Sequence, residues 1–328
     1  MIPISIHDRS HLTTEIDSRT AFLRTLERAQ QAETLGFHRF WTAEHHGVPG
    51  VAGSAPAVFI AAIGNATTTI RIGAGGVMLP NHQPIVVAEQ FATLETLFPG
   101  RVDLGLGRSL GFVRPVRTAL RRDSYSLEEL SDDIAELQSL MLGNSAVALM
   151  PATNPTALFV LATGQGAEVA GLAGLPLVVG GPHILTKDSE GRTAIDRYRQ
   201  VFRASPFATD PYVILNVTAL AAETGAEATN LALSEAWAHV NSKIAGAFLP
   251  LESPEAISMM SLSQRQSNRM NGIVAGSITG TATEVAAQIQ DVVRHVDADE
   301  VLLSGCCFDH AAALKSDALL AKKFGISN

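Results

Sequence analysis

The sequence predicts an α/β protein in which eight strands, each followed by a helix, close into a (β/α)8 TIM barrel. Short apolar runs alternate with segments of helical periodicity along most of the 328 residues, a pattern typical of repeated βα units and a parallel sheet. Eight such units in a chain of this length suit a barrel with insertions. Strand counting leaves a doubly wound open sheet as the alternative.

The predicted strands are apolar runs, and several of the helices between them have recognisable ends. The strands are residues 2–6, 39–42, 71–75, 102–107, 158–162, 175–180, 212–220 and 300–304. The first helix is predicted from an N-cap at Ser18 to Gly36, with the apolar stripe Phe22, Leu26, Ala29 and Ala32. The capping box, in which a hydroxyl and a carboxylate satisfy backbone N–H groups at a helix start, is matched by Ser126 with Glu129 and by Thr281 with Glu284.

One segment fits the alternation poorly. Residues 241–277 place two short apolar stretches between polar ones. We interpret this segment as an insertion over the mouth of the barrel, where loops commonly carry function. An additional surface helix is the alternative interpretation.

The composition excludes several classes of protein. The 24 Lys and Arg against 32 Asp and Glu give a net charge of -8, which argues against a nucleic-acid partner because affinity for phosphate backbones comes from basic residues. The only cysteines, Cys306 and Cys307, are adjacent and therefore poor disulfide partners, as in a reduced intracellular protein. No leader pattern and no run of about eighteen apolar residues is found. We expect a cytoplasmic protein without a membrane segment, forming one domain over residues 1–328.

Residues that follow the strands are the candidates for function, because reactive groups of such barrels project from the carboxyl ends of the strands. The second strand leads into Glu44-His45-His46 and the third into Ala74-Gly75-Gly76. The fourth leads into Gly107-Arg108 and the fifth into Thr163-Gly164-Gln165-Gly166. Four successive strand ends therefore carry polar or glycine-rich segments.

Three interpretations compete for Glu44-His45-His46. A metal site is disfavoured by the spacing, because a helical zinc site separates its histidines by four positions and neighbouring strand residues point to opposite faces. We therefore predict no metal. In a structural role, Glu44 would accept a hydrogen bond from an imidazole, which suits His46. For His45 we favour a proton donor or acceptor, since imidazole titrates near neutral pH.

The other strand ends favour a phosphorylated ligand with a flat ring. Glycines at the third strand end let such a ring approach the backbone, although a plain bulge would also explain them. Arg108 suits a phosphate, although an ion pair with a neighbouring carboxylate is the common alternative. The segment Thr163-Gly164-Gln165-Gly166 opens a helix, whose backbone N–H groups attract anions. The dinucleotide fingerprint is not matched, because the third glycine is missing.

These segments together resemble the bacterial luciferase-like flavin-dependent monooxygenases, the "LLM class" oxidoreductases. The resemblance rests on the sequences RFWTAEHH (39–46), SAP (54–56), IRIGAGGVMLPNH (70–82), VAEQF (87–91) and PGRVDLGLGR (99–108). It is strong over residues 37–111 and extends through strand spacing over the whole chain. Several motifs in the same order make a chance match improbable.

The resemblance implies a barrel that binds FMN, with reduced FMN supplied by a separate flavin reductase. Reaction with O2 would give a flavin C4a-peroxide or hydroperoxide that oxygenates a small organic substrate. His45 would be the catalytic residue, with Glu44 and His46 as supporting neighbours. A non-proline cis peptide would fall at Gly75-Gly76. The expected cofactor-binding residues are Ala74, Gly75, Gly76, Arg108, Thr163, Gly164, Gln165 and Gly166. A homodimer is the family habit.

The sequence departs from the family in two places. The loop after the fifth strand keeps only the hydroxyl of Thr163, where relatives commonly have several, and Gly180-Gly181 replaces a frequent pair of histidines. Two alternatives therefore stay open. The chain could be a non-catalytic flavin-binding subunit, or a deazaflavin (F420)-dependent oxidoreductase that transfers hydride on the same barrel. The sequence implies neither a particular substrate nor light emission.

Overall fold

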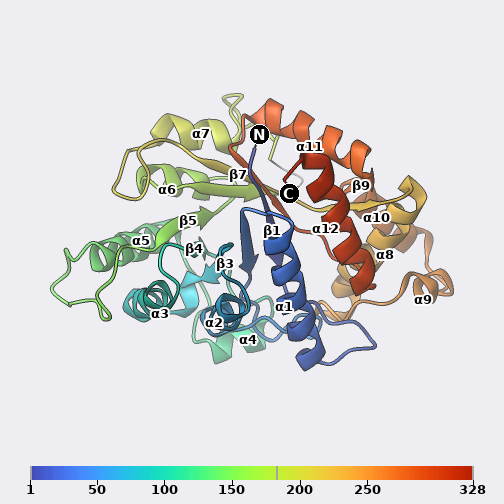
Figure 1. Cartoon of the computed structure of the whole chain (residues 1–328), viewed down its shortest axis with the longest axis horizontal. Helices are drawn as coiled ribbons and strands as arrows, with labels where there is room; N and C mark the ends of the chain where they lie inside the picture. Colours follow the sequence, from blue (N-terminus) through green and yellow to red (C-terminus); the bar gives the residue numbers. More distant parts are fainter. Residues whose placement is uncertain (1, 182–183, 327–328) are drawn as a thin grey trace.

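The computed structural model describes residues 2–181 and 184–326, and its centre is a closed barrel of eight parallel strands (Figure 1). Around the barrel the strands follow the order β1-β10-β7-β6-β5-β4-β3-β2. Strands that follow one another among the eight are thus neighbours in the barrel, as is usual for consecutive βα units. The (β/α)8 TIM barrel is confirmed, and the open sheet is excluded.

Each predicted strand contains or overlaps one barrel strand. The ends of β2 and β4 are as predicted, and the ends of the other strands are shifted. The strands are β1 Ile4–Asp8, β2 Arg39–Thr42, β3 Arg71–Met78, β4 Val102–Gly107, β5 Ala157–Leu161, β6 Leu177–Gly180, β7 Val213–Val217 and β10 Glu300–Leu303. β1 lies two residues later than predicted, so that His7 and Asp8 belong to the strand. β3 continues past Gly75 because its pairing with β4 resumes at Val77 after a register shift.

Helices surround the barrel and cover its outer face (Figure 1). They are α1 Ser18–Thr34, α2 Pro56–Ala66, the short η1 Leu79–Asn81, α3 Pro84–Leu97, α4 Arg114–Ala119, α5 Leu127–Met141, α6 Gly166–Leu172, α7 Ala194–Val201, α11 Ala282–Val296 and α12 His310–Phe324. Both predicted capping boxes are present, at the starts of α5 and α11. The predicted N-cap Ser18 is wrong by one residue, because the carboxylate of Asp17 accepts from the Thr20 amide at 2.8 Å.

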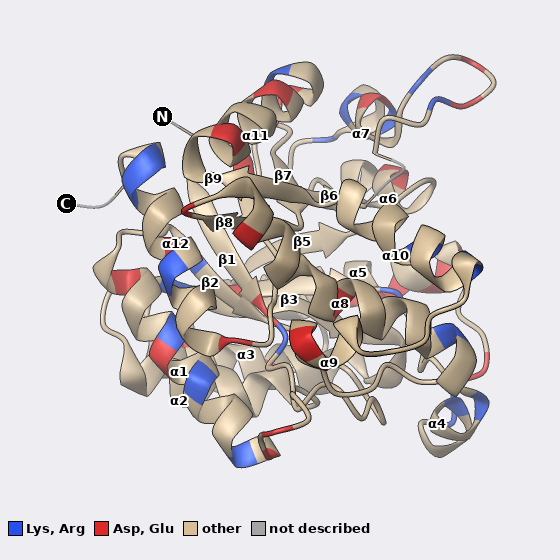
Figure 2. Cartoon of the chain, turned by 90° about the vertical axis from the view of Figure 1, so that its right-hand side faces the viewer, with Lys and Arg blue, Asp and Glu red and all other residues tan. Residues whose placement is uncertain are grey.

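The chain makes an excursion between β7 and β10. It contains β8 Ala219–Ala222, α8 Gly225–Ala245, α9 Pro254–Ser258, α10 Gln264–Ala275 and β9 Ile278–Thr281, with β8 and β9 paired in a separate parallel sheet. The predicted strand 212–220 is thus divided at Thr218 into β7 and β8. The predicted insertion at 241–277 is present, but the excursion begins about twenty residues earlier. α8 and α10 pack side by side (Figure 2).

The lower part of the barrel interior holds a buried ionic network. The Arg39 guanidinium donates to both oxygens of Glu300 at 2.7 and 2.9 Å and to Asp103 at 2.7 Å. Ser5 donates to Glu300 at 2.5 Å, and Arg71 also pairs with Asp103. All of the charge on the two carboxylates is therefore matched by guanidinium groups inside the barrel.

An apolar layer lies above this network and separates it from the upper barrel. It is built from one inward side chain each of β2, β5, β6, β7 and β10: Trp41, Phe159, Val178, Ile214 and Leu302. Trp41 also donates its indole N–H to Asp103 at 3.0 Å. Gly73 and Gly75 make room for it, because a Cβ there would lie 2.9 and 2.8 Å from indole atoms. These glycines are thus needed for the packing of Trp41 as well as for the backbone at the end of β3.

None of the helices in residues 2–181 and 184–326 is long and apolar enough to cross a membrane.

Candidate functional site

A cavity of about 1380 Å3 lies at the carboxyl ends of the barrel strands. Its walls include residues that follow or end β1, β2, β3, β4, β5, β6, β7 and β10, and residues of α8 and α10. Of the sequence-predicted site residues, the structure brings together at this cavity Glu44, His45, Gly75, Gly76, Arg108 and Thr163. Those that do not line it are His46, Ala74, Gly164, Gln165 and Gly166.

Glu44 is a buried carboxylate that joins three segments. One of its oxygens is 2.6 Å from Nε2 of His46 and 2.9 Å from Nε2 of His82, and the other accepts from the Met78 amide at 2.9 Å. Burial raises the pKa of Glu44, but the hydrogen bonds from His46, His82 and Met78 outweigh it and hold the pKa at about 2. Glu44 thus anchors the β2 exit to the β3 exit, and His46 has the structural role that the sequence allowed.

This network predicts a pH-dependent contribution to stability. The folded pKa of Glu44 lies below its ordinary value of 4.5, so its contribution is present above about pH 4.5 and is lost as the pH falls towards 2. Glu44→Gln should therefore lower the free energy of unfolding by on the order of 2–3 kcal/mol at pH 7, and by progressively less below pH 5. Urea denaturation of both proteins at several pH values measures this. Glu15→Gln is the control, and a difference that does not change with pH would contradict the prediction.

His45 faces the cavity with an unsatisfied nitrogen. Its Nδ1 is buried and has no hydrogen-bond partner among the described residues, and its ring stacks on Phe112 at 5.9 Å between centroids and 13° between planes. Burial, followed by the positive charge of Arg9, lowers the pKa of His45 to about 4. The imidazole is therefore neutral near pH 7 and able to accept or share a proton.

Three further residues reach the cavity from the end of β1: His7, Arg9 and His11. Neither nitrogen of His7 has a partner among the described residues, and Nε2 of His11 has none. Burial and then Arg9 lower the pKa of both imidazoles to about 3. Sequence reasoning missed them because it ended the strand at residue 6. Their alternate spacing, typical of one face of a strand, was the available signal.

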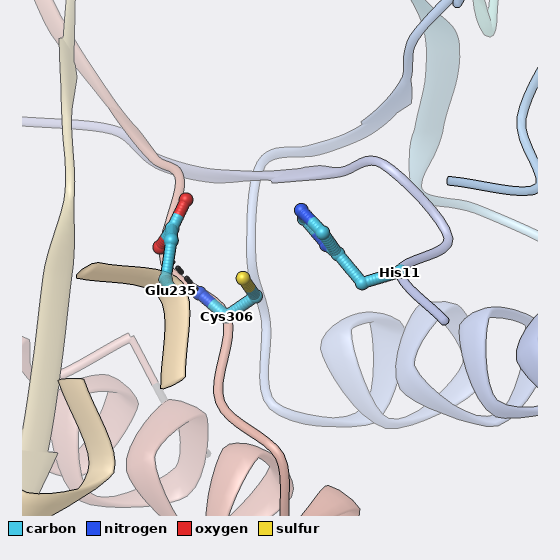
Figure 3. Close-up of side chains that lie close together, drawn as sticks. All are labelled: His11, Glu235 and Cys306. Atoms are coloured by element: carbon cyan, nitrogen blue, oxygen red, sulfur yellow. Dashed lines mark hydrogen bonds between the residues drawn. The ribbon is translucent and has the colours of Figure 1, made fainter. Parts of the chain in front are cut away.

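His11 belongs to a cluster with Glu235 of α8 and Cys306 after β10 (Figure 3). Their possible ligand atoms lie within 4.8 Å of one another, and the Cys306 amide donates to Glu235 at 3.4 Å. Glu235 also forms an ion pair with Arg9. Burial, followed by the charge of Glu235, raises the pKa of the Cys306 thiol well above its ordinary value. Glu235 thus connects α8 to the end of β1 through Arg9 and to the end of β10 through the Cys306 amide.

The third strand end has the backbone geometry that the resemblance implied. The peptide bond between Gly75 and Gly76 is cis. A Cβ at Gly76 would lie 2.6 Å from the carbonyl oxygen of Gly105, so only glycine fits beside β4. Ala74, the preceding residue, is fully buried in the core between the barrel and the helices. At these two glycines the cavity wall is therefore backbone, and Met78 of β3 also lines the cavity.

Arg108 and the loop after β5 offer donors on the next wall. Arg108 is exposed, and no hydrogen bond or ion pair involves its side chain within the described part of the chain. The first amides of α6, those of Gly166 and Ala167, donate to the carbonyls of Thr163 and Gly164. The N–H groups that remain for a ligand in this loop are those of Thr163 to Gln165, and Gly164 adopts a φ of 56°.

The wall formed by α8 and α10 was not predicted residue by residue. It contributes Lys243 and Arg269 to the cavity, and both side chains are exposed. The segment 241–277 was expected to cover the mouth, but no local pattern distinguishes these cations from an ordinary solvated helix face. Only the packing of α10 against α8 brings them to the same wall.

The chain is similar to known proteins along nearly its whole length. Residues 2–298 match the luciferase-like monooxygenase family. Protein YvbT of Bacillus subtilis is 35% identical over 307 residues, which cover 92% of this chain and 90% of that protein. The luciferase-like monooxygenase of Escherichia coli K12 is 34% identical over 324 residues, covering 96% and 95%.

Solved structures share the fold. Apo-MsnO8 superimposes with a TM-score of 0.87 at 28% identity, over 99% of this chain and 98% of that one. An FMN complex of the oxygenating constituent of 3,6-diketocamphane monooxygenase from Pseudomonas putida superimposes with a TM-score of 0.70 at 15% identity. The match covers 98% of this chain and 97% of that one. An F420-dependent secondary alcohol dehydrogenase superimposes with a TM-score of 0.72 at 15% identity, over 100% of this chain and 99% of that one. The last two likenesses concern the fold alone. Because the family match and the relatives both cover most of its length, the chain belongs to the luciferase-like monooxygenase family.

Proposed function

We propose that the protein is a flavin-dependent monooxygenase, which takes reduced FMN from a separate reductase and uses O2 to oxygenate a small organic substrate. The observation that carries the proposal is the convergence of three features on one cavity: the unpartnered imidazoles of His7 and His45, the bare backbone at Gly75-Gly76 and the free guanidinium of Arg108. Membership of the luciferase-like monooxygenase family and the FMN complex of a protein with this fold support it.

The residues of the cavity fit FMN. A flat ring can lie against Gly75-Gly76, where no side chain stands between ligand and backbone. Arg108 can donate to the phosphate, and the hydroxyl of Thr163 with the free amides of its loop can add further hydrogen bonds. Those amides would take the place of the hydroxyl side chains that the family resemblance implies for this loop.

Each polar group then has a defined task. The reduced flavin supplies the electrons with which O2 is activated. His45 holds or transfers a proton at Nδ1, which faces no protein partner among the described residues. Phe112 covers the imidazole and keeps water from one of its faces. Glu44 fixes the β2 and β3 exits relative to each other and so keeps His45 beside Gly75-Gly76.

The proposal is tested by titrating the protein with FMN, FAD, riboflavin and a deazaflavin. FMN should bind in the micromolar range, and reduced FMN with air should give product only when substrate is present. Failure to bind FMN at tens of micromolar in either redox state would refute the proposal. Tight binding without turnover would favour the non-catalytic subunit, and preference for the deazaflavin would favour the F420-dependent oxidoreductase.

Arg108→Ala should weaken the binding of FMN by roughly 1.5–3 kcal/mol and leave the binding of riboflavin unchanged. Only FMN carries the phosphate that forms charge-assisted hydrogen bonds. Fluorescence titration with both flavins measures the difference. Arg114→Ala is the matched control, since Arg114 is also exposed and does not line the cavity. Equal losses for the two flavins would contradict the phosphate role.

We further propose a homodimer that forms through α2 and α3. These helices are in contact with each other and expose Val58 at 75%, Leu97 at 60% and Val86 at 40%, and exposed apolar side chains are common at interfaces. Val58→Glu combined with Leu97→Glu should convert the dimer to a monomer in light scattering. Val147→Glu, at an exposed valine elsewhere, should not. A wild-type protein that is already monomeric would contradict this proposal.

A further inference from the structure

The cavity is larger than one cofactor requires, and its walls carry an excess of positive charge. Pockets for single ligands commonly measure about 300–1,000 Å3, whereas this one has about 1380 Å3. Its described lining includes four basic side chains, Arg9, Arg108, Lys243 and Arg269, and one carboxylate, Glu44. In the whole chain acidic residues outnumber basic ones, 32 to 24. The bias towards positive charge is therefore local to the cavity.

Of these four cations, only Arg9 has a partner among the described residues. Arg9 is paired with Glu235, and Arg108 is assigned above to the flavin phosphate. Lys243 and Arg269 form no hydrogen bond or ion pair with any described residue, and both line the cavity. They are available to an anion that enters the cavity.

α8 and α10 each present one face to the cavity. The lining residues of α8 and its C-cap are His239, Ser242, Lys243 and Gly246, and those of α10 and its C-cap are Arg269, Gly272, Ile273 and Gly276. Both sets have the spacing i, i+3, i+4, i+7 of a single helix face. A Cβ at Gly246 or Gly272 would meet nothing within 4 Å. Each helix thus sets one cation beside small residues that leave space for a ligand.

The wall of α8 and α10 is formed by elements other than the one that carries Arg108. α8 is tied through Glu235 to Arg9 after β1 and to Cys306 after β10. Arg108 follows β4, which is separated from β10 by β7, β6 and β5 in one direction and by β1, β2 and β3 in the other. The ends of β4 and β10 therefore lie across the barrel from each other, and Arg108 belongs to a different part of the fold from Lys243 and Arg269.

The cavity lining also has a large apolar part. It includes Val48, Val51, Phe112, Ile184, Phe248 and Ile273. We propose that the cavity takes, beside the cofactor, a second molecule with an anionic group on an apolar body, and that Lys243 and Arg269 bind this group as they would a carboxylate. This inference rests on the proposed function only for the identity of the first occupant.

Calorimetric titration with octanoate, phenylpropanoate, octanol and octylamine, in the absence and in the presence of FMN, tests the inference. The carboxylates should bind more tightly than the alcohol and the amine. Lys243→Gln and Arg269→Gln should each weaken carboxylate binding about tenfold and leave octanol binding unchanged, because a charge-assisted hydrogen bond is lost in each. Arg265→Gln is the matched control, since Arg265 lies on α10 and does not line the cavity.

Two results would overturn the inference. One is equal or absent binding of the carboxylates relative to octanol. The other is a Lys243→Gln or Arg269→Gln protein that loses affinity for FMN but not for riboflavin, which would assign these cations to the flavin phosphate. If no flavin binds, the proposed function fails, while the titration of the flavin-free protein still decides whether the wall of α8 and α10 selects anions.

Discussion

Methionine in place of Arg39 is expected to lower the free energy of unfolding by about 3–5 kcal/mol. Arg39 is 4% exposed and donates to both Glu300 and Asp103 inside the barrel. Methionine fills similar space but leaves Glu300 without a guanidinium partner, and an uncompensated buried charge costs far more than the net value of the pair. Urea denaturation at pH 7 measures the loss.

The surface pair of Arg294 with Asp291 provides the control for Arg39. Both of its side chains are about 70% exposed, and exposed ion pairs contribute about 0–1 kcal/mol. Arg294→Met should therefore change stability little. Tyr212 also donates its hydroxyl to Glu300, at 3.0 Å. A loss of less than about 1 kcal/mol for Arg39→Met would show that Arg71, Ser5 and Tyr212 compensate the two carboxylates by themselves, and would contradict the expected role of Arg39.

Alanine at His45 is expected to reduce turnover by about 10²–10⁴-fold while FMN still binds, because positioned general acid–base groups contribute on that scale. The pKa of His45 is lowered to about 4 by burial and by Arg9. A base must be unprotonated to act, so the acid limb of the wild-type rate should lie near pH 4–5 rather than near 6.5. Steady-state rates across this range measure both effects.

His295 on α11 supplies a control for the loss of an imidazole. It lies in the last turn of that helix and does not line the cavity, so His295→Ala should leave turnover unchanged. If His45→Ala retains half of the wild-type turnover, or if its loss is entirely in FMN affinity, His45 does not move a proton in the reaction.

The barrel could be predicted from the sequence because its outer residues are apolar and its strands alternate with capped helices. The strand ends were less certain for a physical reason. Residues that point into the lower barrel, such as Arg39, Asp103 and Glu300, are charged, and His7 points into the upper barrel. The apolar residues beside Arg39, Asp103 and Glu300 were enough to place these three in predicted strands. His7 and Asp8 follow the apolar run of β1, so its predicted end came too early and His7, Arg9 and His11 were missed.

Some residues of the candidate site could be predicted from the sequence, and others are placed only by tertiary packing. Glu44, His45, Gly75 and Arg108 directly follow or end strands, so the rule for barrel mouths placed them at the cavity. The hydrogen bond between Glu44 and His82 joins residues 38 positions apart, and no local spacing indicates it. Lys243 and Arg269 reach the cavity only through the packing of α10 on α8.

The packed interior below the cavity has a kinetic consequence. Trp41 and the side chains of its layer fill the barrel, and the Arg39 network lies beneath them. A ligand can therefore enter and leave only on the side of the strand ends. A cofactor and a second ligand that share this single opening must bind in a fixed order. The ligand that lies deeper in the cavity must bind first and dissociate last. Because the barrel interior is closed below the cavity, we expect the product inhibition patterns of a compulsory-order reaction and not those of a random-order reaction.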